Sequence, residues 1–379
     1  MCGKYGYFKL GSEIFSVENP LTIAEIGTSH NGSIQKAMNL IDAAAEAGAR
    51  AVKFQIVYAD EILHPNTGYV DLPTGKIPLY DRFKSLELPE SFYKELAEYS
   101  RSKKLLFSAS PFGFRSAEEL AALKPDFIKI ASPELNYVQL LKYCAGFNIP
   151  MILSSGVSLL KDIEKAVSFL RSENKDLPLA LLHCITSYPA PEKEYNVSVI
   201  KNLSRIFGIS CGVSDHSLDP ILVPVLTLAA GGFIIEKHIC LSRKEEGLDD
   251  PVALEPDMFK KMCSALNSFS KKTYDEIIEG LTKLNYSIEL INEVIGSGEK
   301  KLSPAETKNY GRTNRSIHYL HDLKKGDVMT DKDIAVLRTE KILSPGEAPE
   351  MFDSFIGAVL QRAVKSGEGL LMEDFLTRK

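Results

Sequence analysis

The stretches Ile209-Ser-Cys-Gly-Val-Ser-Asp-His216 and Gly232-Phe-Ile-Ile-Glu-Lys-His238 each predict a short apolar strand that ends in titratable side chains. Imidazole and carboxylate groups are costly to bury unless they are paired or bind a metal ion. Two successive strands with the same kind of ending indicate parallel strands whose carboxyl ends meet at one shared site.

Working outward from these stretches, an apolar run followed by an amphipathic segment occurs eight times between residues 20 and 280. Eight such units close a (β/α)8 TIM barrel of about 250 residues. The last expected helix spans Asp257–Gly280. An open doubly wound sheet is the alternative, but the lack of G-x-G-x-x-G after the first strand favours the barrel. The expected strands are Thr22–Gly27, Ala51–Ile56, Leu105–Ser110, Phe127–Ser132, Met151–Gly156, Leu179–Ile185, Ile209–Ser214 and Phe233–His238.

Three parts are expected along the chain: a catalytic barrel domain at 1–290, a linker at 291–311 and a small β-rich domain at 312–379. A hairpin at Phe8–Phe15 precedes the barrel. The connection 57–90 is long for a barrel loop, and we expect it to serve the active face. The pair Lys300-Lys301 of the linker is expected to be solvated.

Composition excludes several classes of protein. The chain has 379 residues, of which 44% are hydrophobic and 25% charged, as is typical of soluble globular proteins. A net charge of −5 argues against a nucleic-acid or anionic-membrane partner. No apolar run reaches the ~18 residues of a membrane span, and no signal peptide is recognisable. The six cysteines form no C-x-x-C pair, so we expect reduced thiols in a cytoplasmic protein.

Two histidines at the strand ends are candidate metal ligands. His216 and His238 are expected to bind one divalent metal ion, with Glu25 or Glu236 as a supporting partner or base. Each residue alone is explained equally well by a buried neighbour. Four such groups at neighbouring strand ends favour a site, because unpaired burial of that many charges is costly.

Two lysines within apolar strands predict an anion site. Lys53 and Lys129 are placed where apolar side chains are usual. Their ammonium groups are suited to hold a phosphate or a carboxylate. The hydroxyl groups expected to assist are those of Ser110, Ser132, Ser154 and Ser214.

Seven ordered motifs carry a family resemblance. They are Ile23-Ala-Glu-Ile-Gly-Thr-Ser-His-Asn-Gly32, the stretch 42–55, Phe127-Ile-Lys-Ile-Ala-Ser-Pro-Glu134, Ile152-Leu-Ser-Ser-Gly156, Leu181-Leu-His-Cys184 with Tyr188-Pro-Ala-Pro191, Gly212-Val-Ser-Asp-His216 and Ile235-Glu-Lys-His238. Through these the chain resembles the sialic acid synthase family, which includes legionaminic and pseudaminic acid synthases and spore-coat polysaccharide relatives. Residues 316–375 resemble the SAF (antifreeze-like) domain of those enzymes.

The resemblance implies an activity and a set of roles. The reaction would condense phosphoenolpyruvate with an N-acetylated amino-sugar aldehyde, similar to N-acetylmannosamine, to give a nine-carbon 2-keto sugar acid and phosphate. Mn²⁺ or Mg²⁺ would be held by His216 and His238, close to Glu25 and Glu236. Phosphoenolpyruvate would be bound by Lys53, Ser110, Lys129, Ser132, Ser154, Thr186 and Ser214, and the sugar by Gln55, Phe112, Glu134, Tyr188 and Asp249.

The resemblance also implies a domain-swapped homodimer, in which Arg338 reaches the sugar pocket of the partner subunit. Here the chain departs from the family pattern, because Thr339-Glu340 stands where Pro-Gly usually follows that arginine.

Two other functions remain open. A class I aldolase would use Lys129 or Lys53 as a Schiff-base amine on a pyruvate-type substrate. A non-catalytic sugar-binding barrel is the third reading. It would be expected to have lost some of the charged groups at the strand ends, yet Glu25, Lys53, Lys129 and both histidines are present.

Overall fold

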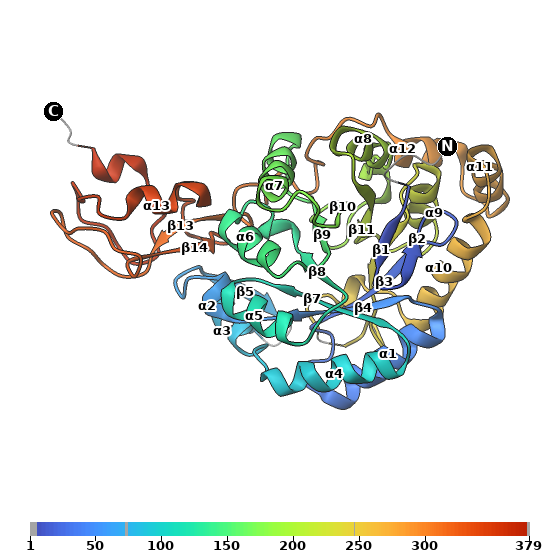
Figure 1. The fold of residues 1–379 in the computed structure, drawn as a ribbon, viewed down its shortest axis with the longest axis horizontal. Coiled ribbons are helices and arrows are strands. Elements are labelled where there is room, and N and C mark those ends of the chain that lie inside the picture. Colours follow the sequence, from blue (N-terminus) through green and yellow to red (C-terminus); the bar gives the residue numbers. More distant parts are fainter. Residues whose placement is uncertain (1–5, 73–74, 246, 377–379) are drawn as a thin grey trace.

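A closed barrel of eight parallel strands forms the larger part of the molecule (Figure 1). The computed structural model describes residues 6–72, 75–245 and 247–376. The last strand pairs with the first, which confirms the predicted TIM barrel. In order around the barrel the strands are β3 (Leu21–Gly27), β4 (Ala51–Ile56), β7 (Leu106–Pro111), β8 (Phe127–Ile130), β9 (Met151–Ser154), β10 (Leu179–Cys184), β11 (Ser210–Asp215) and β12 (Ile234–His238).

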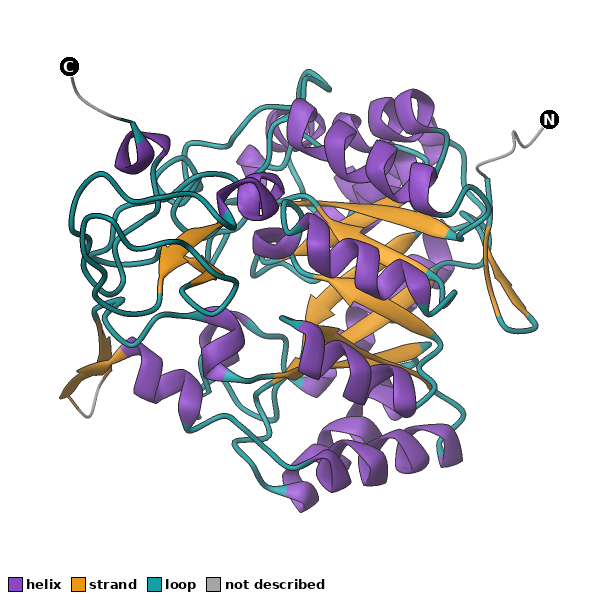
Figure 2. Ribbon diagram, turned by 60° about the vertical axis from the view of Figure 1, so that its left-hand side comes forward, coloured by secondary structure: helices purple, strands orange, loops and turns teal. Residues whose placement is uncertain are grey.

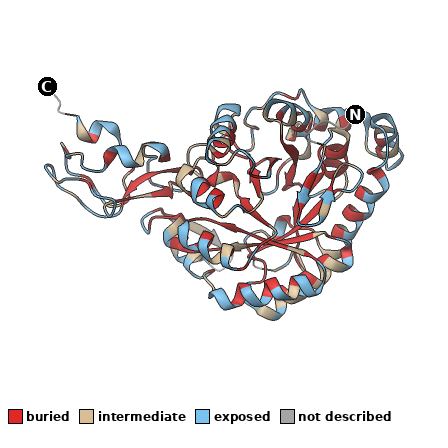
Figure 3. Cartoon of the chain, viewed as in Figure 1, coloured by how far each residue is buried: buried red, intermediate tan, exposed pale blue. Residues whose placement is uncertain are grey.

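Helices cover the outside of the barrel (Figure 2). Buried residues concentrate in the strands and on the inner faces of the helices, as Figure 3 shows, because each amphipathic helix packs its apolar side inward. The helices that follow the eight strands are α1 (Ile34–Ala47), α4 (Glu90–Ser102), α5 (Phe114–Ala122), α6 (Val138–Gly146), α7 (Leu160–Glu173), α8 (Ser198–Phe207), α9 (Leu222–Ala229) and α10 (Pro256–Phe269).

The prediction of a single helix over Asp257–Gly280 is wrong. The chain forms α10 and a separate helix α11 (Tyr274–Lys283) instead. Thr273 starts the new helix with a capping box: its hydroxyl accepts from the N–H of Glu276, and the Glu276 carboxylate accepts from the N–H of Thr273. A further helix, α12 (Ile288–Ile295), crosses the expected domain boundary at 290.

A hairpin closes one end of the barrel. Strands β1 (Phe8–Leu10) and β2 (Glu13–Phe15) pair antiparallel, as predicted, and turn at Gly11, where φ is +57°. The side chains of Phe8, Leu10 and Phe15 are buried against residues at the amino-terminal ends of the barrel strands. The cavity described below lies at the opposite, carboxyl-terminal end.

The long connection between β4 and α4 is structured. It contains α2 (Ala59–Ile62), the antiparallel pair β5 (Tyr69–Leu72) and β6 (Gly75–Pro78), and α3 (Leu79–Lys84). A small apolar cluster joins it to the residues that follow β7: Val57, Ile62, Leu63, Leu79, Leu86 and Phe112.

The C-terminal domain lies at one side of the barrel (Figure 1). Its strands β13 (Arg315–Tyr319) and β14 (Ile334–Arg338) pair antiparallel. Isolated bridges and the short helices η4 (Pro349–Met351), α13 (Phe352–Phe355) and η5 (Met372–Phe375) complete it. Within the described ranges no helix has the length and apolarity needed to cross a membrane. Five cysteines are free and buried, and Cys2 lies outside those ranges.

Candidate active site

One cavity of about 420 Å³ opens at the carboxyl-terminal ends of the strands. Every residue that the sequence predicted for the site lines it, except Glu134, which is completely buried beside it. These lining residues are Glu25, Lys53, Gln55, Ser110, Phe112, Lys129, Ser132, Ser154, Thr186, Tyr188, Ser214, His216, Glu236, His238, Asp249 and Arg338. The carboxyl end of a TIM barrel is where this fold places its chemistry.

The two predicted metal ligands lie beside each other. The ring centroids of His216 and His238 are 5.5 Å apart. Nδ1 of His216 lies 2.8 Å from the carbonyl oxygen of Ile185, so Nδ1–H donates to that oxygen, and in the neutral ring Nε2 would be the nitrogen with the free lone pair. Nδ1 of His238 is buried without a hydrogen bond, and Oδ2 of Asp249 is 3.7 Å from it.

The pKa values of the two histidine rings are shifted in opposite directions. Burial, followed by the positive charge of His216, holds the pKa of His238 well below its usual value, so this ring is neutral. Burial also acts to lower the pKa of His216, but Cys184 and the Ile185 carbonyl raise it to about 9. A divalent cation at His216 therefore has to displace a proton below that pH.

His216 and His238 fit an open metal site, in which the protein does not fill every coordination position of the metal ion. Within the described ranges, no group of three or more His, Cys, Asp or Glu side chains is placed to hold a metal ion. The buried, neutral imidazole of His238 has an unpartnered nitrogen, and Asp249 offers a carboxylate close by. Two adjacent imidazoles would leave the other positions of a bound metal ion to water and substrate, which is typical of a catalytic metal site.

The two predicted anion-binding lysines are almost completely buried. Nζ of Lys129 donates to Oγ of Ser154 at 2.7 Å and lies 3.5 Å from Oε1 of Glu236. Nζ of Lys53 donates to Oγ of Ser110 at 3.3 Å and lies 2.7 Å from Oε2 of Glu25. The two ammonium groups thus share the cavity with serine hydroxyls, which is the arrangement that binds a phosphate or a carboxylate.

The buried lysines and carboxylates of the cavity shift each other's pKa values. Burial raises the pKa of Glu25 to about 7; Lys53 acts against this shift and Glu236 adds to it. Burial alone would raise the pKa of Glu236, but Lys129, Lys53 and the Ser214 hydroxyl lower it, so this carboxylate stays ionised. Burial lowers the pKa of Lys129. The pKa of Lys53 is raised despite its burial, because Glu236 and Glu25 face it. Glu25 is therefore the carboxyl group that changes charge near neutral pH.

Most of the residues assigned to a sugar line the same cavity, next to the metal-site and anion-site residues. Tyr188 is half exposed and lies flat on His216, with ring centroids 4.2 Å apart and planes at 26°. Nε2 of Gln55 donates to Oε1 of Glu25 at 3.0 Å. The guanidinium of Arg338 lies over the Phe112 ring, 5.3 Å from its centroid. An apolar platform with polar groups at its edge suits a hydroxylated ligand.

Sequence reasoning missed Arg315. Its side chain is fully buried, and its guanidinium donates to Oε1 of Glu134 and to the carbonyl oxygens of Glu61 and Phe112. Arg338 donates to the same Oε1 at 2.7 Å. In this structure both arginines reach the cavity wall of their own chain, and the domain-swapped homodimer stays a prediction. The arginine at the start of the strand Arg315–Tyr319 was the signal to notice.

The linker is also part of the wall. Asn309 of the linker lines the cavity, as does Thr313 just after the linker. The expectation that Lys300 is solvated is wrong, because Nζ of Lys300 donates to the carbonyl oxygen of Ser155 at 3.0 Å and the residue is only partly exposed. The linker contacts the strand ends over long sequence separations, which local composition does not reveal.

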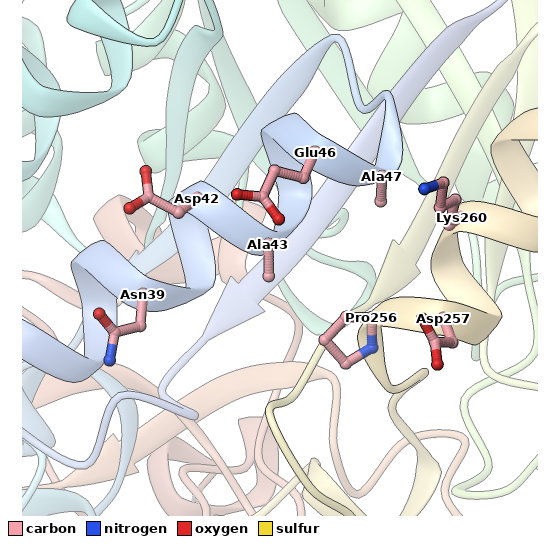
Figure 4. A pocket seen from close by; sticks show the side chains of 8 residues that line it. All are labelled: Asn39, Asp42, Ala43, Glu46, Ala47, Pro256, Asp257 and Lys260. Carbon is pink, nitrogen blue, oxygen red and sulfur yellow. The ribbon is translucent and has the colours of Figure 1, made fainter.

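A second hollow, of about 310 Å³, lies between α1 and α10 on the outside of the molecule (Figure 4). Its carboxylates are partly engaged, since Asp42 accepts from the Tyr99 hydroxyl and pairs with Lys103 at 2.7 Å. It is built from helix residues only, so it is separate from the cavity at the strand ends. Its lining is Asn39, Asp42, Ala43, Glu46, Ala47, Pro256, Asp257 and Lys260.

The fold and the cavity define a (β/α)8-barrel protein with a charged site at its strand ends and a small C-terminal domain. A model of the NeuB family matches residues 40–277, and a model of the SAF domain matches residues 314–376. The chain belongs to the NeuB family, and its C-terminal part is an SAF domain.

Individual relatives agree with this assignment. The spore coat polysaccharide biosynthesis protein SpsE of Bacillus subtilis is 32% identical over 98% of each chain. An N,N'-diacetyllegionaminic acid synthase of Legionella pneumophila is 31% identical over 93% of each chain. The crystal structure of SpsE has a TM-score of 0.83 to this one at 30% identity, covering 98% of this chain and 100% of that one.

Proposed function

We propose that this protein condenses phosphoenolpyruvate with an N-acetylated amino-sugar aldehyde, in a reaction that depends on Mn²⁺ or Mg²⁺. The products are a nine-carbon 2-keto sugar acid and phosphate. The observation that carries the proposal is that two adjacent imidazoles and an ammonium-lined anion pocket share one cavity. Relatives named as acid synthases of this type support it.

The anion pocket would hold phosphoenolpyruvate. Lys53 and Lys129 already face Glu25 and Glu236, and the phosphate and carboxylate of phosphoenolpyruvate would be further anionic partners for the two ammonium groups. The hydroxyls of Ser110 and Ser154, already in contact with these lysines, would direct the phosphate. As phosphate leaves, the two ammonium groups stabilise the charge that develops on it.

Glu25 would move the proton. A carboxyl group with a pKa of about 7 is suited to general base catalysis near neutral pH. Glu25 would accept a proton from the water that adds to C2 of phosphoenolpyruvate, while C3 forms the new bond to the aldehyde carbon and the aldehyde oxygen becomes an alkoxide. Glu25 would return that proton to the alkoxide. The C2–O bond to phosphate then breaks, and the C2 hydroxyl gives its proton to the departing phosphate to leave the 2-keto group. Gln55 donates to Glu25 and holds its carboxyl group in place.

The sugar aldehyde would lie against Tyr188 and Phe112. Tyr188 offers an apolar face next to His216, and Arg338 covers Phe112. His216 and His238 would hold the metal, which supplies Lewis-acid polarisation of the aldehyde oxygen when bound.

A phosphate-release assay tests the proposal. The protein would be incubated with phosphoenolpyruvate, Mn²⁺ and a panel of amino-sugar aldehydes that includes N-acetylmannosamine and 2,4-diacetamido sugars. We expect release with at least one acceptor and none after EDTA treatment. Background release with every acceptor, from protein that has bound Mn²⁺, would contradict the proposal.

One observation favours a second function, a class I aldolase. The burial that lowers the pKa of Lys129 makes an amine a better nucleophile for Schiff-base formation. Borohydride reduction with pyruvate separates the two functions. A stable adduct, found by mass spectrometry and absent in Lys129→Met, would favour the aldolase.

A further inference from the structure

The peptide group between Ile185 and Thr186 is held from both of its sides. Its carbonyl oxygen accepts from Nδ1 of His216 at 2.8 Å. Its N–H donates to Oε2 of Glu306 in the linker at 2.9 Å. Because the two bonds belong to one planar peptide group, the linker carboxylate and the histidine ring are mechanically connected.

The same carboxylate holds a second strand end. Oε2 of Glu306 also accepts from the N–H of Val157 at 2.9 Å. Val157 has φ of +41°, in the left-handed region that a β-branched residue rarely adopts. Asn314, at the start of the SAF domain, donates to the carbonyl of Val157, and Asn309 of the linker donates to the carbonyl of Thr186. Linker side chains thus satisfy the backbone groups that follow both β9 and β10.

Glu306 is itself buried, with 1% of its surface exposed. Its negative charge is compensated by backbone N–H groups, since Oε1 accepts from Ser303 and Oε2 from Val157 and Thr186. No ion pair to Glu306 occurs among the residues that the structure covers. Hydrogen bonds to a charged acceptor are about twice as strong as neutral ones, so the carboxylate is an effective clamp.

We propose that Glu306 is a positioning residue for the metal site. By fixing the Ile185–Thr186 peptide, it keeps that carbonyl aimed at Nδ1 of His216 and leaves Nε2 for the cation. Outer partners of this kind orient metal-binding imidazoles, and losing one typically weakens metal affinity or activity by about 10–100-fold. The inference rests on the proposed metal-dependent function and assigns a role in it to the linker.

Direct Mn²⁺ binding tests the role without an activity assay. The affinity would be measured by electron paramagnetic resonance of free Mn²⁺ for the wild type, Glu306→Ala and Glu306→Gln. We expect Glu306→Ala to bind Mn²⁺ about tenfold more weakly, the lower end of the range for outer partners. Glu306→Gln should recover most of the affinity, because the amide oxygen can still accept from Val157 and Thr186.

Glu299→Ala is the matched control. It removes a carboxylate from the same linker, but its exposed side chain makes no hydrogen bond or ion pair among the described residues. Its Mn²⁺ affinity should equal that of the wild type. Thermal unfolding of each variant reports whether the fold is retained.

The outcomes separate this inference from the proposed function. Unchanged Mn²⁺ affinity in a folded Glu306→Ala variant, even with a lower melting temperature, would overturn the positioning role. Equal weakening in Glu299→Ala would also overturn it. A wild-type protein that binds no Mn²⁺ and releases no phosphate would instead reject the proposed function.

Discussion

Arg315 of the SAF domain and Glu134 of the barrel form an ion pair in which neither side chain is exposed to solvent, with 3.0 Å between Nη2 and Oε1. The pair joins the two domains at the edge of the cavity. A buried pair is costly to form, but removing one partner is more costly, because it leaves an uncompensated charge.

Glu134→Ala should therefore lower the free energy of unfolding by about 3–5 kcal/mol. Urea denaturation measures this change. The matched control is Glu350→Ala, which breaks the exposed pair between Lys165 of the barrel and Glu350 of the SAF domain. That variant should cost less than about 1 kcal/mol. Similar costs for the two variants would show that burial does not determine the strength of the Glu134 contact.

Loss of a metal-site imidazole should separate binding from folding. His238→Ala is expected to abolish Mn²⁺ binding and metal-dependent phosphate release, while circular dichroism shows the wild-type fold. His321→Ala removes an exposed histidine of the SAF domain and should change neither property. Near-wild-type turnover in His238→Ala would contradict the assigned ligand role.

The pH dependence of kcat/KM should report Glu25. Its pKa is raised to about 7, so its basic form is lost as pH falls through that value. We expect kcat/KM for phosphate release to decline with unit slope below pH 7. Glu25→Gln should lose most of the rate, and its remaining rate should lack this acidic limb. If Glu25→Gln kept the same decline of kcat/KM below pH 7, the titrating group would be a residue other than Glu25.

Buried neutral histidines should make the fold sensitive to acid. Burial lowers the pKa of His30 and His318 to about 4 each, against the usual 6.5. The unfolded chain therefore binds protons that the folded chain does not, and stability present above pH 6.5 is lost as pH falls toward 4.

At pH 5 each of these histidines should cost on the order of 2 kcal/mol relative to pH 7. Urea unfolding at the two pH values measures the loss. His318→Gln should reduce the difference between them, whereas His321→Ala, at an exposed site, should not. An undiminished pH effect in His318→Gln would exclude His318 as a source.

Much of the fold could be predicted because its signals are local. Strands such as Phe127–Ile130 are short runs in which apolar residues predominate, and the helices between them have one buried face. Polar residues at strand ends converge in any closed parallel barrel, so Lys53, Lys129, His216 and His238 could be placed together from their positions alone.

The parts that were missed depend on contacts between distant segments. Arg315 meets Glu134 across 181 positions, and Glu306 meets Val157 across 149. Neither contact leaves a periodic trace in the sequence. The break between α10 and α11 was missed for a different reason, because Thr273 and Glu276 form a cap inside an otherwise helical pattern.

Among the described residues, Phe8, Leu10 and Phe15 pack against the amino-terminal ends of the strands, so the barrel core offers the active-site cavity no passage at that end. Substrates and products would then enter and leave at the carboxyl-terminal ends of the strands. They are phosphoenolpyruvate, the sugar, water, phosphate and the acid product. The product that leaves last would block the site for the next substrate. The rate of turnover would therefore depend on product release as well as on the chemical step.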